Sequence, residues 1–231
     1  RFDVLAIQPE LMTNGMRALP NNDYYHIYNG YCEGITFTDE TDLSLMMVYG
    51  NSNCRAYEQD EPQFEGDYDV IFKLPRVPNE GTYELRVAVA NGAARGMMQV
   101  YVGTDKNNLS AIGLPIDMRY DENTERIGWF RDTEDKEENT RMERNMRNHD
   151  VMKGPKCYGS ISSAGTTSGR DDGFSLHKLR HIIFRGYVNP EQTYYVRFKN
   201  VLTNPAANFD IDYFEWVPKN VYAGVEAEDY W

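Results

Sequence analysis

Short segments with alternating polar and apolar residues recur along this chain and constrain its fold more than any other feature. In Thr82–Ala90, apolar side chains occupy every second position, which is the period of a strand with one face in a core. Residues that end strands, chiefly Gly, Pro and Asn, separate these segments. The further segments of this kind are Ile35–Thr38, Leu43–Tyr49, Tyr68–Leu74, Met97–Val102, Ile112–Met118, Leu176–Gly186, Thr193–Asn200 and Phe209–Val217. Because no regular strand–helix alternation occurs, the pattern predicts an all-β, antiparallel β-sandwich.

Three of these segments allow finer predictions. Ile35–Thr38 and Leu43–Tyr49 are joined by the acidic turn Asp39–Asp42, and we expect them to pair as a hairpin. A proline interrupts Ile112–Met118. Because proline has no N–H to donate to a neighbouring strand, this segment is predicted to lie at the edge of a sheet.

One segment departs from the strand pattern. Lys136–Asn148 contains neither Gly nor Pro, its acidic residues lead, and its basic residues trail, which suits the dipole of a helix. Met142 and Met146 are four residues apart and share one helical face. We therefore predict one helix there, within a loop excursion over 136–173, inserted in a single domain that covers 1–231.

The charge balance excludes some partners. The chain has 231 residues, with 24 Lys+Arg against 36 Asp+Glu, so its formal net charge is −12. A basic face, which nucleic acids and anionic membranes require, is not expected from this balance. No apolar run approaches the roughly 20 residues of a transmembrane helix. The chain starts inside an expected strand with no signal peptide, so we expect an excised piece or a mature form.

Residues that carry common catalytic or metal chemistry are few. Cys32, Cys54 and Cys157 have no metal-like spacing, which leaves a Cys32–Cys54 disulfide or buried reduced thiols as the alternatives. No G-x-S-x-G, H-E-x-x-H or Walker motif occurs. Asp212 and Glu215 point to opposite faces of one strand, so they cannot flank one glycosidic bond. We predict that the chain is not an enzyme.

Two histidines lie four positions apart, at His177 and His181. On a strand they share a face about 13 Å apart, which is too far for both to bind one metal ion. We therefore interpret them as residues of a solvated strand face.

Aromatic residues around the excursion are the best candidates for a binding site. Trp129 lies in the loop before the predicted helix, and Tyr120 and Tyr158 flank the excursion. An exposed flat ring can stack on a sugar, while neighbouring charged groups bind its hydroxyls. Alternatively, Trp129 fills the core where the excursion docks. The candidate ligand-binding residues are Trp129, Tyr120, Tyr158, Asp121, Asp132, Arg126 and Arg170.

Longer phrases of the sequence resemble a known group of modules. GTYELRVAVANG, MMQVYVG, YYVRFKNVL and NFDIDYFEWVPKNVY, in this order, resemble strands of a galactose-binding-like jelly roll, as in many carbohydrate-binding modules. FDVLAIQPEL, DYDVIFKLPRVPNEGTYELRVAVA and MRNHDVMKGP extend the resemblance to the C-terminal module that follows fasciclin domains in surface lipoproteins of gut Bacteroidetes. The resemblance covers nearly the whole chain, although no fasciclin domain is present in it.

The resemblance implies a jelly-roll sandwich at the bacterial cell surface, anchored to the outer membrane or periplasmic. It implies a non-catalytic carbohydrate-binding module of a lipoprotein linked to glycan capture. The alternative is a structural or adhesive module that packs on a fasciclin domain, and a glycoside hydrolase ranks last. The implied partners are a glycan, an adjacent fasciclin domain and outer-membrane glycan-uptake proteins.

The resemblance also implies a metal site. In similar modules, an acid of the closing strand helps to hold a structural calcium ion, and Asp212 occupies that position here. Calcium prefers six to eight oxygen ligands, which Glu33, Asp39 and Asp42 would help to supply. The alternative is that Asp212 caps a turn or pairs with an arginine.

Overall fold

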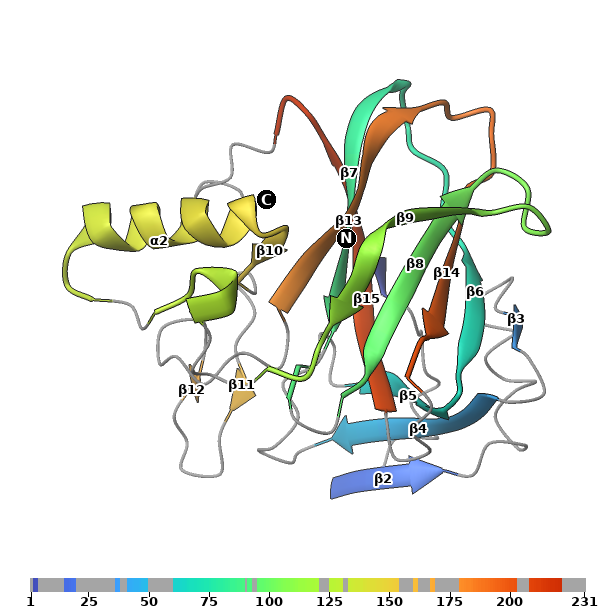
Figure 1. The fold of residues 1–231 in the computed structure, drawn as a ribbon, viewed down its shortest axis with the longest axis horizontal. Coiled ribbons are helices and arrows are strands. Elements are labelled where there is room, and N and C mark those ends of the chain that lie inside the picture. The colour runs from blue at the N-terminus through green and yellow to red at the C-terminus, as the bar shows by residue number, and fades with distance from the viewer. Residues whose placement is uncertain are drawn as a thin grey trace.

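The computed structural model describes residues 2–3, 15–19, 36–37, 41–49, 60–89, 91–92, 95–120, 125–130, 133–153, 160–161, 167–168, 179–202 and 208–221. These residues form two large antiparallel sheets that face each other, with one α-helix at their side (Figure 1). The prediction of an all-β sandwich with one helix is confirmed. A small two-stranded sheet is made by β11 (Ser160–Ile161) and β12 (Thr167–Ser168).

The larger sheet has eight strands, and their order along the sheet mixes distant parts of the sequence. The order is β10 (Val151–Met152), β13 (Leu179–Val188), β7 (Gly81–Val89), β15 (Asn208–Pro218), β5 (Asp60–Gly66), β4 (Thr41–Tyr49) and β2 (Gly15–Leu19), with β1 (Phe2–Asp3) paired to β15. The central strands β7 and β15 therefore hold together segments more than a hundred residues apart.

The smaller sheet has five strands. The order is β3 (Thr36–Phe37), β6 (Asp69–Lys73), β14 (Tyr195–Asn200), β8 (Met97–Gly103) and β9 (Ser110–Asp117). The strand with the internal proline, β9, lies at an edge of this sheet, as predicted.

The predicted hairpin between the first two segments is wrong. Strand β3 pairs with β6 in the smaller sheet, whereas β4 pairs with β5 and β2 in the larger one. Leu43 on β4 lies opposite Phe64 on β5. The two segments on either side of the acidic stretch therefore belong to different sheets. Alternation identifies a strand but does not identify its partner, and sandwich connections commonly cross between layers.

The core fills the space between the two sheets. Leu85, Val87 and Val89 point into it from every second position of β7. Phenylalanines from both sheets meet there, and the ring centroids of Phe198 and Phe209 are 5.1 Å apart. Each such side chain contributes roughly 1.5–3 kcal/mol when buried, so this layer supplies much of the stability.

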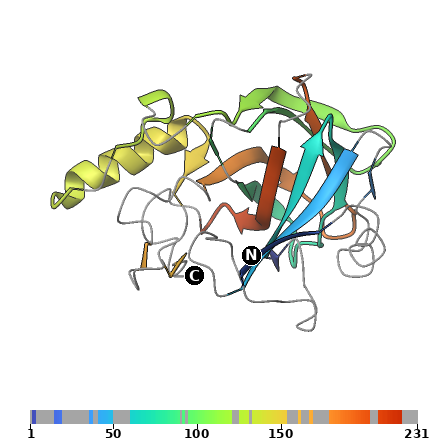
Figure 2. The same ribbon diagram turned by 90° about the horizontal axis from the view of Figure 1, so that it is seen from below.

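Helix α2 (Lys136–Asn148) has the predicted bounds. It begins where the Asp135 carboxylate accepts hydrogen bonds from the backbone N–H groups of Glu137 and Glu138. Figures 1 and 2 show that its N-terminal half projects away from the sandwich. No helix in the described part of the chain combines the length and apolar character needed to cross a membrane.

A second, smaller core holds α2 to the sandwich. Met142 and Met146 are buried on the helical face predicted from the sequence. Their apolar neighbours are Tyr120, Ile127, Val151 and Leu179, with Trp129 and Phe130 packed against the cluster. The helix is therefore attached by one stripe near its C-terminal half.

Gly128 permits the close approach of α2. Its φ is +74°, and a Cβ atom there would lie 2.4 Å from Nδ2 and 3.1 Å from the backbone carbon of Asn145. We expect Gly128→Ala to lower the free energy of unfolding by about 2 kcal/mol, because the left-handed conformation alone costs about 1–2 kcal/mol and the clash adds to it. Urea unfolding measures this loss.

Gly113 is the matched control for this change. Its φ is +59°, and a Cβ there would meet no atom within 4 Å. Gly113→Ala therefore adds left-handed strain without a clash and should cost less than Gly128→Ala. Equal losses for the two variants would contradict a steric role for Gly128.

Candidate functional site

A pocket of about 360 Å³ opens where the edges of the two sheets approach each other. Strand β9 forms one wall, and β13 and β10 of the larger sheet form the opposite wall. The short 3-10 helix η3 (Glu125–Ile127) and the residues that follow α2 close a third side. The pocket thus lies at the junction of the sandwich and the excursion.

The floor of the pocket is aliphatic. Val100, Ile112 and Ile116 come from the smaller sheet, and Ile183 comes from the larger one. All four belong to the main core or pack against it. The floor is therefore rigid and apolar, and it suits the carbon skeleton of a small ligand.

A bulge in β9 forms the apolar part of the rim. Met98 lies opposite Ile116, but Val100 lies opposite Ile112, so the residues between Ile112 and Ile116 bulge out of the ladder. Gly113 provides the left-handed conformation of this bulge, and Leu114 is 86% exposed at its tip. The side-chain amide of Gln99 donates to the carbonyl of Ile112 and holds the bulge in place.

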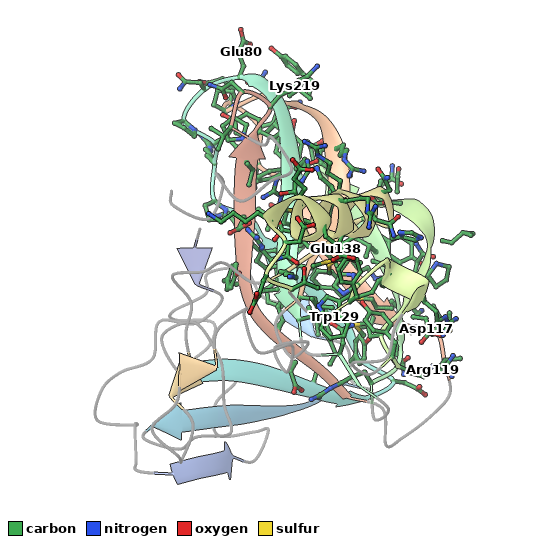
Figure 3. All side chains as sticks on the ribbon, turned by 90° about the vertical axis from the view of Figure 1, so that its left-hand side faces the viewer. Glu80, Asp117, Arg119, Trp129, Glu138 and Lys219 are labelled. Atoms are coloured by element: carbon green, nitrogen blue, oxygen red, sulfur yellow. The ribbon has the colours of Figure 1, made fainter. Side chains whose placement is uncertain are left out.

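One polar part of the rim is an aspartate held by an arginine. Arg119 donates from Nε and Nη2 to the two oxygens of Asp117, at 2.9 and 3.0 Å. These hydrogen bonds hold the pKa of Asp117 below its usual value. Nη1 of Arg126 lies 3.8 Å from Asp117 Oδ2. Figure 3 shows Asp117 and Arg119 together, to one side of Trp129.

The other polar part of the rim follows the C-terminus of α2. Asp150 has a φ of +58°, the left-handed conformation common after a helix end. Its carbonyl accepts from the Ile182 N–H, and its carboxylate lies 2.5 Å from Nη1 of Arg185. The neighbouring His149 contacts the Asn145 carbonyl through Nδ1, at 2.9 Å. Both rim residues are thus fixed by contacts with the fold.

A buried histidine lies in the wall between these groups. His181 on β13 is only 2% exposed, and its Nε2 lies 3.2 Å from the Tyr120 hydroxyl and 3.4 Å from the Asn91 amide. Burial lowers the pKa of His181 to about 4, so the ring is neutral at pH 7. Burial also raises the pKa of Tyr120 above its usual value.

The prediction that His181 faces solvent is wrong. It lies opposite Val151 of β10, and the excursion that carries β10 and α2 covers this end of β13. The local sequence around His181 contains no sign of this cover, because the covering residues are contributed from far along the chain.

A buried ion network lies behind the pocket. Glu84 is fully buried, and its carboxylate contacts Arg86 at 2.7 Å, Arg147 at 2.5 Å and Arg185 at 3.0 Å. Burial alone would raise the pKa of Glu84, but the charge of Arg86 and the hydrogen bonds from Arg147 and Arg86 outweigh it. The pKa therefore lies below its usual value. Because Arg147 lies on α2 and Arg185 holds Asp150, this carboxylate connects the sheet, the helix and the rim.

Two of the predicted ligand-binding residues, Tyr120 and Arg126, line this pocket. Trp129 is half-buried and packs against the small core under α2, and it is not among the described residues that line the pocket. The other candidates, Tyr158, Asp121, Asp132 and Arg170, lie outside the described residues. A role for Tyr158 in stacking on a sugar stays a prediction.

The predicted metal and cysteine chemistry falls largely outside the described residues, which exclude Glu33, Asp39 and the three cysteines. Asp42 belongs to β4, where it lies opposite Glu65 of β5. Asp212 belongs to β15. On the same strand, Asp210 is buried and lies 2.6 Å from Nη1 of Arg95. Within the described ranges, no group of three or more His, Cys, Asp or Glu side chains is placed to hold a metal ion. The calcium and disulfide hypotheses stay predictions.

The sequence did not single out Asp117, His149, Asp150 or His181 as members of one site. The signal available for Asp150 was its place just after the predicted helix end, where a polar residue in a left-handed conformation is common. For His181 the contact with Tyr120 spans 61 positions of sequence, which a local pattern does not reveal.

No family model matches the chain, and no curated protein matches it. The function must therefore be inferred from the geometry of the pocket and from the sequence.

Proposed function

We propose that this chain is a non-catalytic carbohydrate-binding module that takes its sugar in the pocket between β9 and β13. The observation that carries this proposal is the combination of an aliphatic floor with a rim of fixed charged groups. At about 360 Å³, the pocket is near the lower end of the range for small-ligand sites, roughly 300–1,000 Å³. This size suits one or two sugar rings.

The two surfaces of the pocket match the two surfaces of a sugar. The C–H face of a ring packs on Leu114 and Ile112, while the hydroxyls bond to charged groups at the rim. The carboxylates of Asp117 and Asp150 accept from hydroxyls. Because Arg119 and Arg185 already hold these carboxylates, binding costs little side-chain entropy.

The same contacts argue against catalysis. A glycosidase needs one carboxyl group that stays protonated to act as a general acid. Asp117 has a lowered pKa, so it is ionised near neutral pH. His181 is neutral, buried and hydrogen-bonded. Asp117 and His181 thus serve binding better than proton transfer.

The cellular setting is proposed on the resemblance alone. In that setting the module belongs to a cell-surface lipoprotein of the outer membrane and follows or contacts a fasciclin domain. It would retain glycans for uptake. Weak affinity at a single site is expected, because a sugar has little apolar area and loses water from its hydroxyls on binding.

Binding can be tested at the exposed tip of the bulge. Leu114→Ala removes apolar contact with the sugar but little packing within the protein, since this side chain is 86% exposed. We expect about fivefold weaker binding, which corresponds to about 1 kcal/mol of lost apolar contact. Glycan arrays identify the sugar, and isothermal titration calorimetry measures its affinity for each variant.

Val201→Ala is the matched control, because Val201 is an exposed apolar residue outside the pocket lining. It should leave the affinity unchanged. A protein that retains no glycan on the array would overturn the proposal and favour the adhesive alternative. Equal sugar affinities for the Leu114→Ala and Val201→Ala variants would show that the sugar does not bind in this pocket.

A further inference from the structure

We infer that the sugar bound in this pocket carries a carboxylate, as a uronic acid residue does, and that Arg126 binds that carboxylate. The inference rests on the proposed function and narrows its ligand class. It follows from how the charges around the rim are already paired.

Both described carboxylates of the rim have an arginine of their own. Asp117 receives two side-chain hydrogen bonds and one backbone hydrogen bond from Arg119. Asp150 lies 2.5 Å from Arg185, which also contacts Glu84. These two acids are therefore neutralised by groups other than Arg126.

Arg126 is the cation left over among the described residues that line the pocket. Its side chain is 72% exposed, and its shortest described contact with an acid is 3.8 Å, to Asp117. That distance exceeds the roughly 3.2 Å limit of a normal N–H···O hydrogen bond. The guanidinium thus keeps its donors for a ligand at the mouth of the pocket.

A carboxylate is the group that such a guanidinium binds best. The planar fork of five N–H donors matches the two oxygens of a carboxylate and forms two parallel charge-assisted hydrogen bonds. A neutral sugar offers single hydroxyls instead. Asp117 and Asp150 are hydrogen-bond acceptors, so they bind the ligand hydroxyls and leave the ligand carboxylate to Arg126.

The net charge of the chain further limits the class of glycan that can bind. At a net charge of −12, the chain repels a polyanion at long range. A single carboxylate is affected much less, because screening leaves the local contact in place. A largely neutral glycan with an isolated uronic acid residue fits both Arg126 and the net charge of the chain, whereas a polyuronate fits Arg126 but is repelled by the net charge.

The test compares acidic and neutral sugars that share one ring stereochemistry. Methyl galacturonide is compared with methyl galactoside, and methyl glucuronide with methyl glucoside, by calorimetry on the full chain. For the preferred stereochemistry we expect the acid to bind about tenfold tighter, the value of one charge-assisted pair at about 1.4 kcal/mol. Added salt should reduce this preference.

Arg126→Gln should remove the preference, so that the acidic and the neutral sugar bind this variant with equal affinity. Arg144→Gln is the matched control, because Arg144 is exposed on α2, outside the pocket lining, and its change alters the net charge equally. It should retain the preference. A circular dichroism melt of each variant confirms that both remain folded.

The outcomes separate the two claims. Equal affinity for acid and neutral sugar in the unmodified protein would overturn this inference and leave the proposed function standing. A preference that survives Arg126→Gln would place the carboxylate elsewhere and overturn the assignment of Arg126. Binding of neither sugar class, together with a glycan array without any retained glycan, would overturn both.

Discussion

Glu84→Gln is expected to lower the free energy of unfolding by about 3–5 kcal/mol, the usual cost of removing one partner from a buried ion network. The Glu84 carboxylate is fully buried and is contacted by Arg86, Arg147 and Arg185. The amide has nearly the same shape but no charge, so it leaves the buried guanidinium of Arg86 without its closest described anion. The loss is electrostatic and does not come from a cavity.

Thermal unfolding measures this loss. For a chain of this length, 3–5 kcal/mol corresponds to a fall in Tm of about 6–20 °C. Glu80→Gln is the control, because Glu80 is exposed and bonds only the Tyr187 hydroxyl among the contacts described for it. It should shift Tm by less than about 2 °C. Similar shifts in both variants would show that the network around Glu84 does not stabilise the fold.

The second large effect is a loss of stability in mild acid that depends on His181. The folded-state pKa of His181 is about 4, whereas a histidine in an unfolded chain titrates near 6.5. Below about pH 6.5 the histidine binds a proton in the unfolded state but not in the folded state. The free energy of unfolding therefore falls as the pH falls. Between pH 7 and pH 5 this linkage should cost about 2 kcal/mol.

Glu84 and Asp117 add little in this range, because both have lowered pKa values. Their stabilising effect is present above the unfolded pKa of roughly 4 and is lost only as the pH falls further. The interval from pH 7 to pH 5 therefore keeps these two carboxylates ionised while the histidine linkage develops.

Urea unfolding at the two pH values tests the assignment. His181→Phe keeps a planar ring and removes the titrating group, so its stability should change by less than about 1 kcal/mol between pH 7 and pH 5. His149→Gln removes an exposed histidine and should keep the full pH dependence. If His181→Phe loses as much stability in acid as the unmodified protein, another group is responsible.

Periodicity was enough to predict the strongest elements. The bounds of α2 match the predicted helix, and β7 matches its predicted strand within one residue, because each has an uninterrupted apolar period. Strand β5 was missed, since Asp60–Gly66 has acids and a proline where a strand would carry apolar side chains. Only Phe64 of this strand is described as part of the main core. The pairing with β4 and β15 makes it a strand.

The site was less accessible to prediction than the fold. Tyr120 and Arg126, which line the pocket, were predicted as ligand-binding residues because they lie near the aromatic loop that precedes the excursion. The apolar floor was not predicted, because Val100, Ile112 and Ile183 look like ordinary core residues in the sequence. They become pocket residues because the β9 edge of one sheet and the β10 edge of the other lie on opposite sides of the pocket, and the position of an edge depends on long-range pairing.

The bulge of β9 also affects whether this sheet edge can pair with a strand of another molecule. A free sheet edge usually offers an unbroken row of backbone donors and acceptors, on which a strand of another molecule can form. Here Pro115 lacks a donor, and Gly113 turns the backbone out of line. This edge of the smaller sheet is therefore a poor template for intermolecular strand addition.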